Sequence, residues 1–254
     1  MNIAVCVKQV VTRDWPLRVN ETAEWVRDHD ASFEMNEPDA YALEEALRLK
    51  EQHGGEVVVC VAGPSRVSQV IREALARGAD RAIHVQHDEL AFADANVVAS
   101  SLAHAMLSEQ FDLVLTGLQS DDQGFGQTGV ILAERLGLPH ATIVMEVDAG
   151  GTDTIRVKRE LEGGWFQWVR MPTPALLTIQ SGINQLRYAT LKGIMAAKKK
   201  EVRVAEIQEL QPAGQHIVHL YVPEKEKATR FVEGAPDAAS RELVRLLREE
   251  ARVL

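Results

Sequence analysis

The residues of this chain that are best suited to chemistry lie in a glycine-rich loop between a predicted strand and a predicted helix. The strand begins at Phe111, the loop opens at Thr116-Gly117, and the helix follows as VILAERLG at 130–137. A strand, a glycine-rich loop and a helix in this order present backbone N–H groups and a helix N-terminus to a phosphate. Its glycines, which allow close backbone approach, are Gly124, Gly126 and Gly129. Its side chains that can donate hydrogen bonds are those of Gln127 and Thr128. The loop therefore predicts a phosphate site, while an ordinary turn with Thr128 as the helix cap is the alternative.

Strands and helices alternate along residues 1–147, and this is the arrangement that would hold the loop at the edge of a sheet. The patterns predict strands at 2–10, 56–63, 81–85, 111–115 and 140–147, and helices at 39–53, 65–78, 94–110 and 130–137. Such alternation predicts an α/β chain with a Rossmann-like, doubly wound, mostly parallel sheet. Ligands of these sheets bind at the carboxyl ends of the strands, where the strand order reverses. We therefore expect the loops after Val7, Ala62 and Gly117 to converge on one ligand.

The pattern changes after about residue 148. Segments 154–161 and 165–171 predict an antiparallel β-hairpin that turns near Gly163-Gly164. Segment 174–180 predicts one more buried strand. From 181 to 200 neither a helical nor a strand period is strong.

The C-terminal region contains a linker-like stretch and a distant amphipathic helix. Pro212 and Gly214 interrupt any regular pattern, and a helix is predicted at 237–254. A helix beyond a polar linker indicates an extended arm that packs on another chain. A return of the helix to its own core fits the pattern equally well.

The composition restricts the classes of function. The 254 residues are 46% hydrophobic and carry a formal net charge of −9, which argues against non-specific nucleic-acid binding and against anionic membranes as partners. No apolar run is long enough for a membrane-spanning helix, so we expect no direct membrane insertion. Cys6 and Cys60 lie in apolar runs, and we expect buried free thiols and a cytoplasmic location.

Several motifs of catalysis and metal binding are missing. The eight histidines form no HxxEH-type or HxH pair, and the chain has no GxSxG nucleophile motif. The GQTG segment lacks the lysine of a P-loop. We therefore predict no catalytic residue and no metal site, and a nucleotide that serves as a structural ligand.

Six segments, in this order, resemble the β subunit of electron transfer flavoproteins. They are VCVKQV, NEPDAYALEEALRLKE, VAGP with EALARGADRAIHV, SDDQGFGQTG, VKRELEGG and RYATLKGIMAAKKK. The resemblance covers Asn2 to about Arg203. It implies an adenine nucleotide alpha-hydrolase-like α/β domain at 1–203, and an arm at 204–254 that packs on a partner α subunit. In such heterodimers the α subunit holds most of an FAD, which carries electrons from flavin dehydrogenases to a quinone oxidoreductase or another acceptor.

The resemblance leaves two nucleotides open for the β-subunit site. In the common branch of the family the site holds structural AMP, and in the electron-bifurcating branch it holds a second FAD at which NADH reacts. The loop DDQGFGQTG and the segment NEPDAYALE differ from the DGDTAQVG-type and NPDDKNALE-type segments of the bifurcating branch, which favours AMP. NEPDAY also differs from the NPF-type segment of the common branch, which leaves a less usual subgroup open. Outside the family, a universal-stress-type nucleotide-binding homodimer is the alternative.

The resemblance, carried over position by position, implies a nucleotide site built from four segments. Its residues are Cys6, Asn36, Glu37, Pro38, Asp39, Ala62, Asp122, Gln123, Gly124, Phe125, Gly126, Gln127, Thr128 and Gly129. We expect backbone amides between Gln123 and Gly129 to meet the phosphate.

Four nearby polar residues have open roles. We expect the side chains of Asp121 and Asp122 to point away from the phosphate, toward ribose hydroxyls or solvent. Asn36 either bonds ribose or adenine or caps the following turn. Lys8 either neutralises phosphate charge or is solvated.

The resemblance also implies a partner-recognition loop at 185–200. Its residues are Leu191, Ile194, Met195, Lys198, Lys199 and Lys200, with Leu191 as the anchor that enters a pocket on a dehydrogenase. The alternative is that Leu191 and Met195 are core residues of a short helix and that the lysines are only solvated. Glu160 matches a glutamate that affects how the flavin domain of the α subunit settles, and the aromatic residues Trp165, Phe166 and Trp168 indicate a packed or subunit-facing hairpin.

Overall fold

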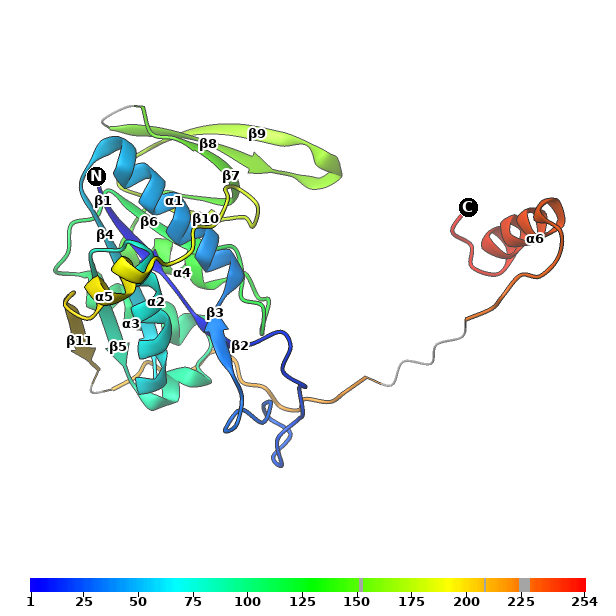
Figure 1. The fold of residues 1–254 in the computed structure, drawn as a ribbon, viewed down its shortest axis with the longest axis horizontal. Helices are drawn as coiled ribbons and strands as arrows, with labels where there is room; N and C mark the ends of the chain where they lie inside the picture. Colours follow the sequence, from blue (N-terminus) through cyan, green and yellow to red (C-terminus); the bar gives the residue numbers. More distant parts are fainter. Residues whose placement is uncertain (151–152, 208, 224–228) are drawn as a thin grey trace. The chain divides into compact units, whose positions relative to one another are not determined.

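The structure is a computed structural model that describes residues 1–150, 153–207, 209–223 and 229–254. The described residues form two compact units, Met1–His219 and Leu220–Leu254. In the first unit, nine of the described strands form one sheet in the order β11-β5-β4-β1-β6-β10-β7-β8-β9 (Figure 1). These strands are β1 (Asn2–Cys6), β4 (Glu56–Gly63), β5 (Arg81–Gln86), β6 (Leu113–Gly117), β7 (His140–Asp148), β8 (Thr154–Glu160), β9 (Phe166–Pro172), β10 (Ala175–Ile179) and β11 (Val202–Glu206).

The strands from β11 to β7 run parallel, and β8 and β9 extend the sheet antiparallel. The chain runs from β1 outward to β4 and β5 on one side, and then crosses to β6 on the other side of β1. The strand order therefore reverses at β1. The central strands are apolar at nearly every position because both faces of the sheet are covered, as in β6 and β10, where all residues are buried. The doubly wound, mostly parallel fold predicted from the sequence is confirmed.

Helices cover both faces of the sheet (Figure 1). They are α1 (Glu37–His53), α2 (Ser68–Arg77), α3 (Ala95–Met106), α4 (Thr128–Leu136) and α5 (Leu191–Ala197). Leu43 of α1, Leu75 of α2 and Ala197 of α5 belong to one apolar core. Leu102 of α3 and Leu132 of α4 belong to the other. The second face of the sheet is therefore covered by α3, which follows β5, and α4, which follows β6. Both helices lie close to the point where the strand order reverses.

The first predicted strand is wrong at its C-terminal end. β1 ends at Cys6, and Gln9–Val11 forms a separate strand, β2, which pairs antiparallel with β3 (Phe33–Met35). Lys8 and Gln9 interrupt the apolar run here, but Val10 and Val11 resume it, so the pattern alone does not reveal that the chain leaves the sheet after Cys6. This change of direction brings the segment after β1 next to the start of α1, where Asn36 N donates to Lys8 O at 3.0 Å.

Two elements of the first unit were not predicted from the sequence, α5 within 181–200 and β11 just beyond it. α5 begins after Thr190, whose side chain caps the helix by accepting a hydrogen bond from Gly193 N at 3.0 Å. β11 pairs in parallel with β5 and forms an edge of the sheet. The expected boundary between domain and arm, at 203/204, falls within β11.

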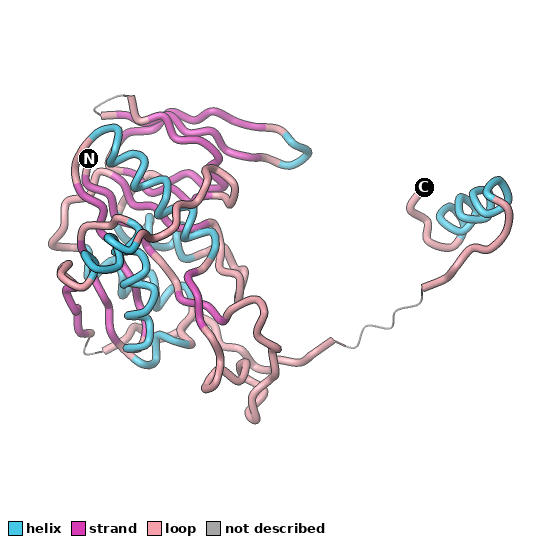
Figure 2. Tube along the Cα trace, in the orientation of Figure 1, coloured by secondary structure: helices cyan, strands magenta, loops and turns pink. Residues whose placement is uncertain are grey.

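The antiparallel hairpin of β8 and β9 extends away from the helices (Figure 2). The turn between the two strands includes a short 3-10 segment, η3 (Glu162–Gly164), at the predicted Gly163-Gly164 position. Glu160 pairs with Phe166 at the base of this turn. The hairpin predicted from the sequence is therefore confirmed.

The second unit contains helix α6 (Pro236–Glu249). None of the residues of α6 is buried, and Leu243 and Val244 are exposed. Arg245 forms ion pairs with Glu242 and Glu249 along the polar side of the helix. The described part of this unit therefore does not cover the apolar side of its own helix. Among the described residues, no helix combines the length and apolar character needed to cross a membrane.

Candidate functional site

A pocket lies at the carboxyl ends of β1, β4 and β6, where the strand order reverses. The residues of the expected nucleotide site that line it are Cys6, Asn36, Asp39, Ala62, Gln123, Phe125, Gly126, Gln127, Thr128 and Gly129. The convergence of loops far apart in the sequence follows from the parallel sheet, because its carboxyl ends share one edge. Four residues of the expected nucleotide site are not among the described residues that line the pocket: Glu37, Pro38, Asp122 and Gly124.

Some lining residues were not predicted. Leu90 and Ala91 of η2 (Asp88–Ala91) join Val98 and Leu102 of α3 in the lining and give it an apolar wall. This segment follows β5 and carries no recognisable motif. Its position after a parallel strand was the sequence feature that could have predicted it as part of a ligand site. An apolar wall beside polar groups is typical of pockets for small molecules with a ring and a charged end.

Among the described residues, the backbone amides at the start of α4 are the donors of the pocket that lack a protein partner, and they are the groups best suited to an anion. Within the described part of the chain, no protein acceptor meets the amides of residues 125–130, and Ile131 is the first residue whose N–H bonds within the helix, to Gln127 O. The positive end of the helix dipole adds to these donors. α4 has no side-chain cap, so the alternative in which Thr128 caps the helix is wrong.

Two amides of the expected set are already used inside the loop. Gln123 N donates to Ser120 Oγ at 3.4 Å and to Asp122 Oδ1 at 2.7 Å, and Gly124 N donates to Ser120 O at 2.9 Å. The amides of Gln123 and Gly124 already have protein acceptors, so the expected phosphate-binding set is reduced to the amides from Phe125 onward. The turn at 120–124 thus precedes the open amides and sets their direction.

The glycines of the loop have two different physical roles. Gly124 and Gly126 adopt left-handed backbone conformations, with φ of 66° and 63°, which glycine accepts without strain. Gly129 is needed for close packing instead, because a Cβ there would lie 2.6 Å from Thr116 Oγ1 and 2.7 Å from Thr178 Cγ2. Gly129 therefore lets the first turn of α4 rest directly on the sheet.

Asn36 holds the loop after β6. Its Nδ2 donates to Gln119 O at 3.0 Å and its Oδ1 accepts from Asp121 N at 2.8 Å. Asn36 stands at the N-cap position of α1, but its side chain makes no capping hydrogen bond to the helix, so the alternative of a side-chain cap is wrong. A contact between Asn36 and ribose or adenine stays a prediction.

Asp39 joins β1 to β6 beneath the pocket. Its Oδ2 accepts from Lys8 N at 2.8 Å, and its Oδ1 accepts from Gly117 N at 2.9 Å. The carboxyl group is buried, and this burial raises its pKa to about 7, against the lowering effect of the two backbone hydrogen bonds. Asp39 therefore titrates in the physiological range in the folded chain.

We expect this titration to lower the stability of the nucleotide-free chain as the pH rises. The native carboxyl keeps its proton up to about pH 7, whereas the unfolded group loses it near 3.8. Between these two pH values the folded state binds more protons than the unfolded state. The free energy of unfolding therefore falls as the pH rises, and it levels off above pH 7. Relative to D39N, the free energy of unfolding of the wild type should drop by about 2 to 4 kcal/mol from pH 4.5 to pH 8. Urea titrations at four pH values measure this, and parallel profiles for the two proteins would contradict the shifted pKa.

The two aspartates of the loop are paired with cations. Asp122 Oδ1 lies 2.7 Å from Lys8 Nζ, and Asp121 Oδ2 lies 3.3 Å from Arg13 Nη2. Arg13 also pairs with Glu37. Both residues are exposed and neither lines the pocket, which agrees with side chains that point away from a phosphate; their ion pairs with protein cations were not predicted.

The cysteines lie side by side on neighbouring strands and are inert. Cys6 of β1 is the register partner of Cys60 of β4, and both are free and buried. Burial raises the pKa of the Cys6 thiol well above its ordinary value and that of Cys60 to about 12. Both thiols are neutral at physiological pH, so neither is a nucleophile. Among the described residues, no group of three or more His, Cys, Asp or Glu side chains is placed to hold a metal ion.

The segment expected to recognise a partner forms a short amphipathic helix with its apolar side exposed. In α5, Leu191 is 79% exposed, and Ile194 and Met195 are exposed beside it. The opposite side packs on α2 so closely that a Cβ at Gly193 would lie 2.2 Å from Ala76 O. Leu191 and Met195 are therefore not core residues, and the core alternative is wrong.

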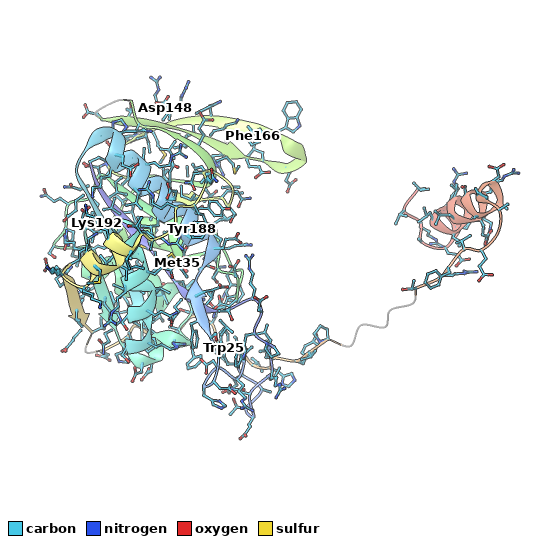
Figure 3. All side chains as sticks on the ribbon, in the orientation of Figure 1. Trp25, Met35, Asp148, Phe166, Tyr188 and Lys192 are labelled. Atoms are coloured by element: carbon cyan, nitrogen blue, oxygen red, sulfur yellow. The ribbon has the colours of Figure 1, made fainter. Side chains whose placement is uncertain are left out.

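The charged residues of this segment separate into two kinds. Lys198 and Lys199 are exposed. Lys200 instead donates from Nζ to Leu75 O and Ala79 O at the end of α2, so it does not extend the free cationic run. Tyr188 and Lys192, labelled in Figure 3, are exposed on the same segment.

The β8–β9 hairpin carries exposed aromatic side chains. Trp165, Phe166 and Trp168 are exposed, and Phe166 is labelled on the hairpin in Figure 3. Arg156 lies over the ring of Trp168, and Lys158 lies over the ring of Phe166. The three aromatic side chains are therefore not buried in the first unit, and the alternative of a packed hairpin is wrong. The alternative of a hairpin that faces another subunit stays a prediction. Glu160 accepts a hydrogen bond from Gln180 Nε2 at 3.3 Å.

Comparison with known proteins identifies the family. A family model described as the electron transfer flavoprotein domain matches residues 24–210. The chain is 35% identical, over 98% of each chain, to the electron transfer flavoprotein subunit beta of Methylophilus methylotrophus. It is 34% identical to the subunit of the same name from Bacillus subtilis, and 36% identical to the mitochondrial one from Oryza sativa subsp. japonica, over 100% of each chain. The chain therefore belongs to the electron transfer flavoprotein β-subunit family.

Proposed function

We propose that this chain is the β subunit of a heterodimeric electron transfer flavoprotein and that its pocket holds AMP as a structural ligand. The observation that carries the proposal is the row of open amides from Phe125 to Val130 at the start of α4, at the reversal of strand order. A terminal phosphate fits these donors. The apolar wall of Leu90, Val98 and Leu102 offers a surface for the adenine ring.

The redox cofactor of this proposal is FAD held mainly by an α subunit, which supplies electron transfer when it is bound. The β chain contributes protein surfaces to the complex. Helix α6, none of whose residues is buried, provides an apolar stripe for the α subunit. The exposed side of α5 around Leu191 provides a docking site for flavin dehydrogenases, and electrons pass on to a quinone oxidoreductase or another acceptor.

Nucleotide extraction tests the proposal. The chain is co-expressed with an α-type partner chain, the complex is purified and denatured, and the released nucleotides are quantified by mass spectrometry. We expect about one AMP, from the pocket of this chain, and about one FAD, from the α subunit, per heterodimer. Two FAD and no AMP would instead indicate the bifurcating type with NADH oxidation. A homodimer that carries no flavin would indicate a nucleotide-binding protein of the universal-stress type.

A further inference from the structure

Lys8 connects the end of β1 to the turn that precedes the open amides. Its Nζ donates to Asp122 Oδ1 at 2.7 Å, to Gln123 Oε1 at 3.2 Å and to Ser120 Oγ at 3.4 Å. Ser120 and Asp122 also accept the internal hydrogen bonds of this turn, from the amides of Gln123 and Gly124. One ammonium group thus holds three side chains of a single turn.

The backbone of Lys8 is fixed as well. Lys8 N donates to Asp39 Oδ2 at 2.8 Å, and Lys8 O accepts from Asn36 N at 3.0 Å. Both partners lie at the start of α1 and are buried. The side chain of Lys8 therefore starts from a rigid point, and a rigid origin is what allows one side chain to set the position of a loop.

The charge of Lys8 also matters for an anionic ligand. Among the described residues that line the pocket, Lys8 is the one with a cationic side chain. Asp122 is close in sequence to the open amides, and an unpaired carboxylate there would repel a phosphate. The ion pair with Lys8 neutralises this carboxylate while it holds the turn.

We propose that Lys8 is a positioning residue for the nucleotide phosphate. Through its pair with Asp122 it fixes the turn at 120–124, so that the amides from Phe125 onward face the phosphate. Lys8 acts on the loop and not on the ligand. This inference rests on the proposed function, because it assumes that the pocket binds AMP.

The test compares a ligand that has the phosphate with one that lacks it. AMP and adenosine are titrated calorimetrically into the nucleotide-depleted full chain. We expect K8M to weaken AMP binding by about tenfold, the loss of one charge-assisted contact, and adenosine binding by less than about threefold. D122N should give the same pattern, and K8M/D122N should be no weaker than K8M, since both changes remove one pair. D122N keeps the size of its side chain and carries the comparison if K8M does not fold.

A matched control and three outcomes decide the matter. K50M removes another lysine–aspartate pair, with Lys50 Nζ 2.6 Å from Asp80 Oδ1, outside the described lining, and should leave AMP affinity unchanged. Equal losses for AMP and adenosine would overturn the inference. So would a D122N chain that binds AMP as well as the wild type while K8M does not, because Lys8 would then contact the phosphate itself. A wild type without affinity for AMP would overturn the proposed function and this inference together.

Discussion

Replacement of Gly117 by alanine should unfold the region around the pocket and abolish nucleotide binding. A Cβ at this position would lie 2.4 Å from Asp39 Oδ1, 2.7 Å from Pro38 Cβ and 2.8 Å from Asp39 N. Because one of these atoms belongs to the backbone of α1, the clash is relieved only by moving the helix start. The same shift breaks the hydrogen bond from Gly117 N to Asp39 Oδ1. We expect the free energy of unfolding to fall by about 3 kcal/mol and the nucleotide content by about tenfold or more.

Urea unfolding and chromatography of the extracted nucleotide measure these two effects. Gly137→Ala is the matched control, because Gly137 has a left-handed φ of 66° and a Cβ there would meet nothing within 4 Å. That change should cost only about 1 kcal/mol of backbone strain and should leave the nucleotide in place. Equal stability losses in the two variants would show that packing between β6 and α1 is not what Gly117 provides.

Replacement of Leu191 by alanine should slow electron transfer from a partner dehydrogenase without changing the cofactor content. An exposed leucine on a helix whose other side is firmly packed offers a rigid apolar side chain that a pocket on a partner can bury. A loss of about 2 kcal/mol at such a site corresponds to roughly a 30-fold lower second-order rate constant for flavin reduction. Stopped-flow reduction of the purified heterodimer by the dehydrogenase measures this constant.

Leu107 offers the control for this experiment. It is 73% exposed at the end of α3, and no docking role is assigned to it. Leu107→Ala should leave the rate constant within about a factor of two, as most surface changes do. The docking role of α5 would be refuted by a Leu191→Ala complex that is reduced as fast as the wild type while AMP and FAD remain bound.

Several features of the chain followed directly from local sequence. The apolar runs of β4, β6 and β10 and the helical period of α1 and α3 identify buried strands and covering helices, because these patterns depend on neighbouring residues. The glycine-rich loop predicted an anion site because a strand, a loop and a helix in succession have a fixed local geometry. The order of motifs identified the family.

Other features depended on contacts between distant segments. β11 is recognisable as a strand only through its pairing with β5, since its own side chains do not form a buried face. The exposed side of α5 became evident only when its other side was seen to pack on α2. The pairing of Asp122 with Lys8 joins residues that are 114 positions apart.

The sequence by itself determined the fold class, the place of the glycine-rich loop between β6 and α4, and the family of this protein. The tertiary structure decided which amides of the loop lack a protein acceptor, and that Lys8 and Asn36 hold the loop. It also decided that the carboxyl group of Asp39 is buried. The physical reason is that period and turn chemistry act over a few residues. Desolvation and the pairing of buried polar groups depend instead on which segments the folded sheet brings together.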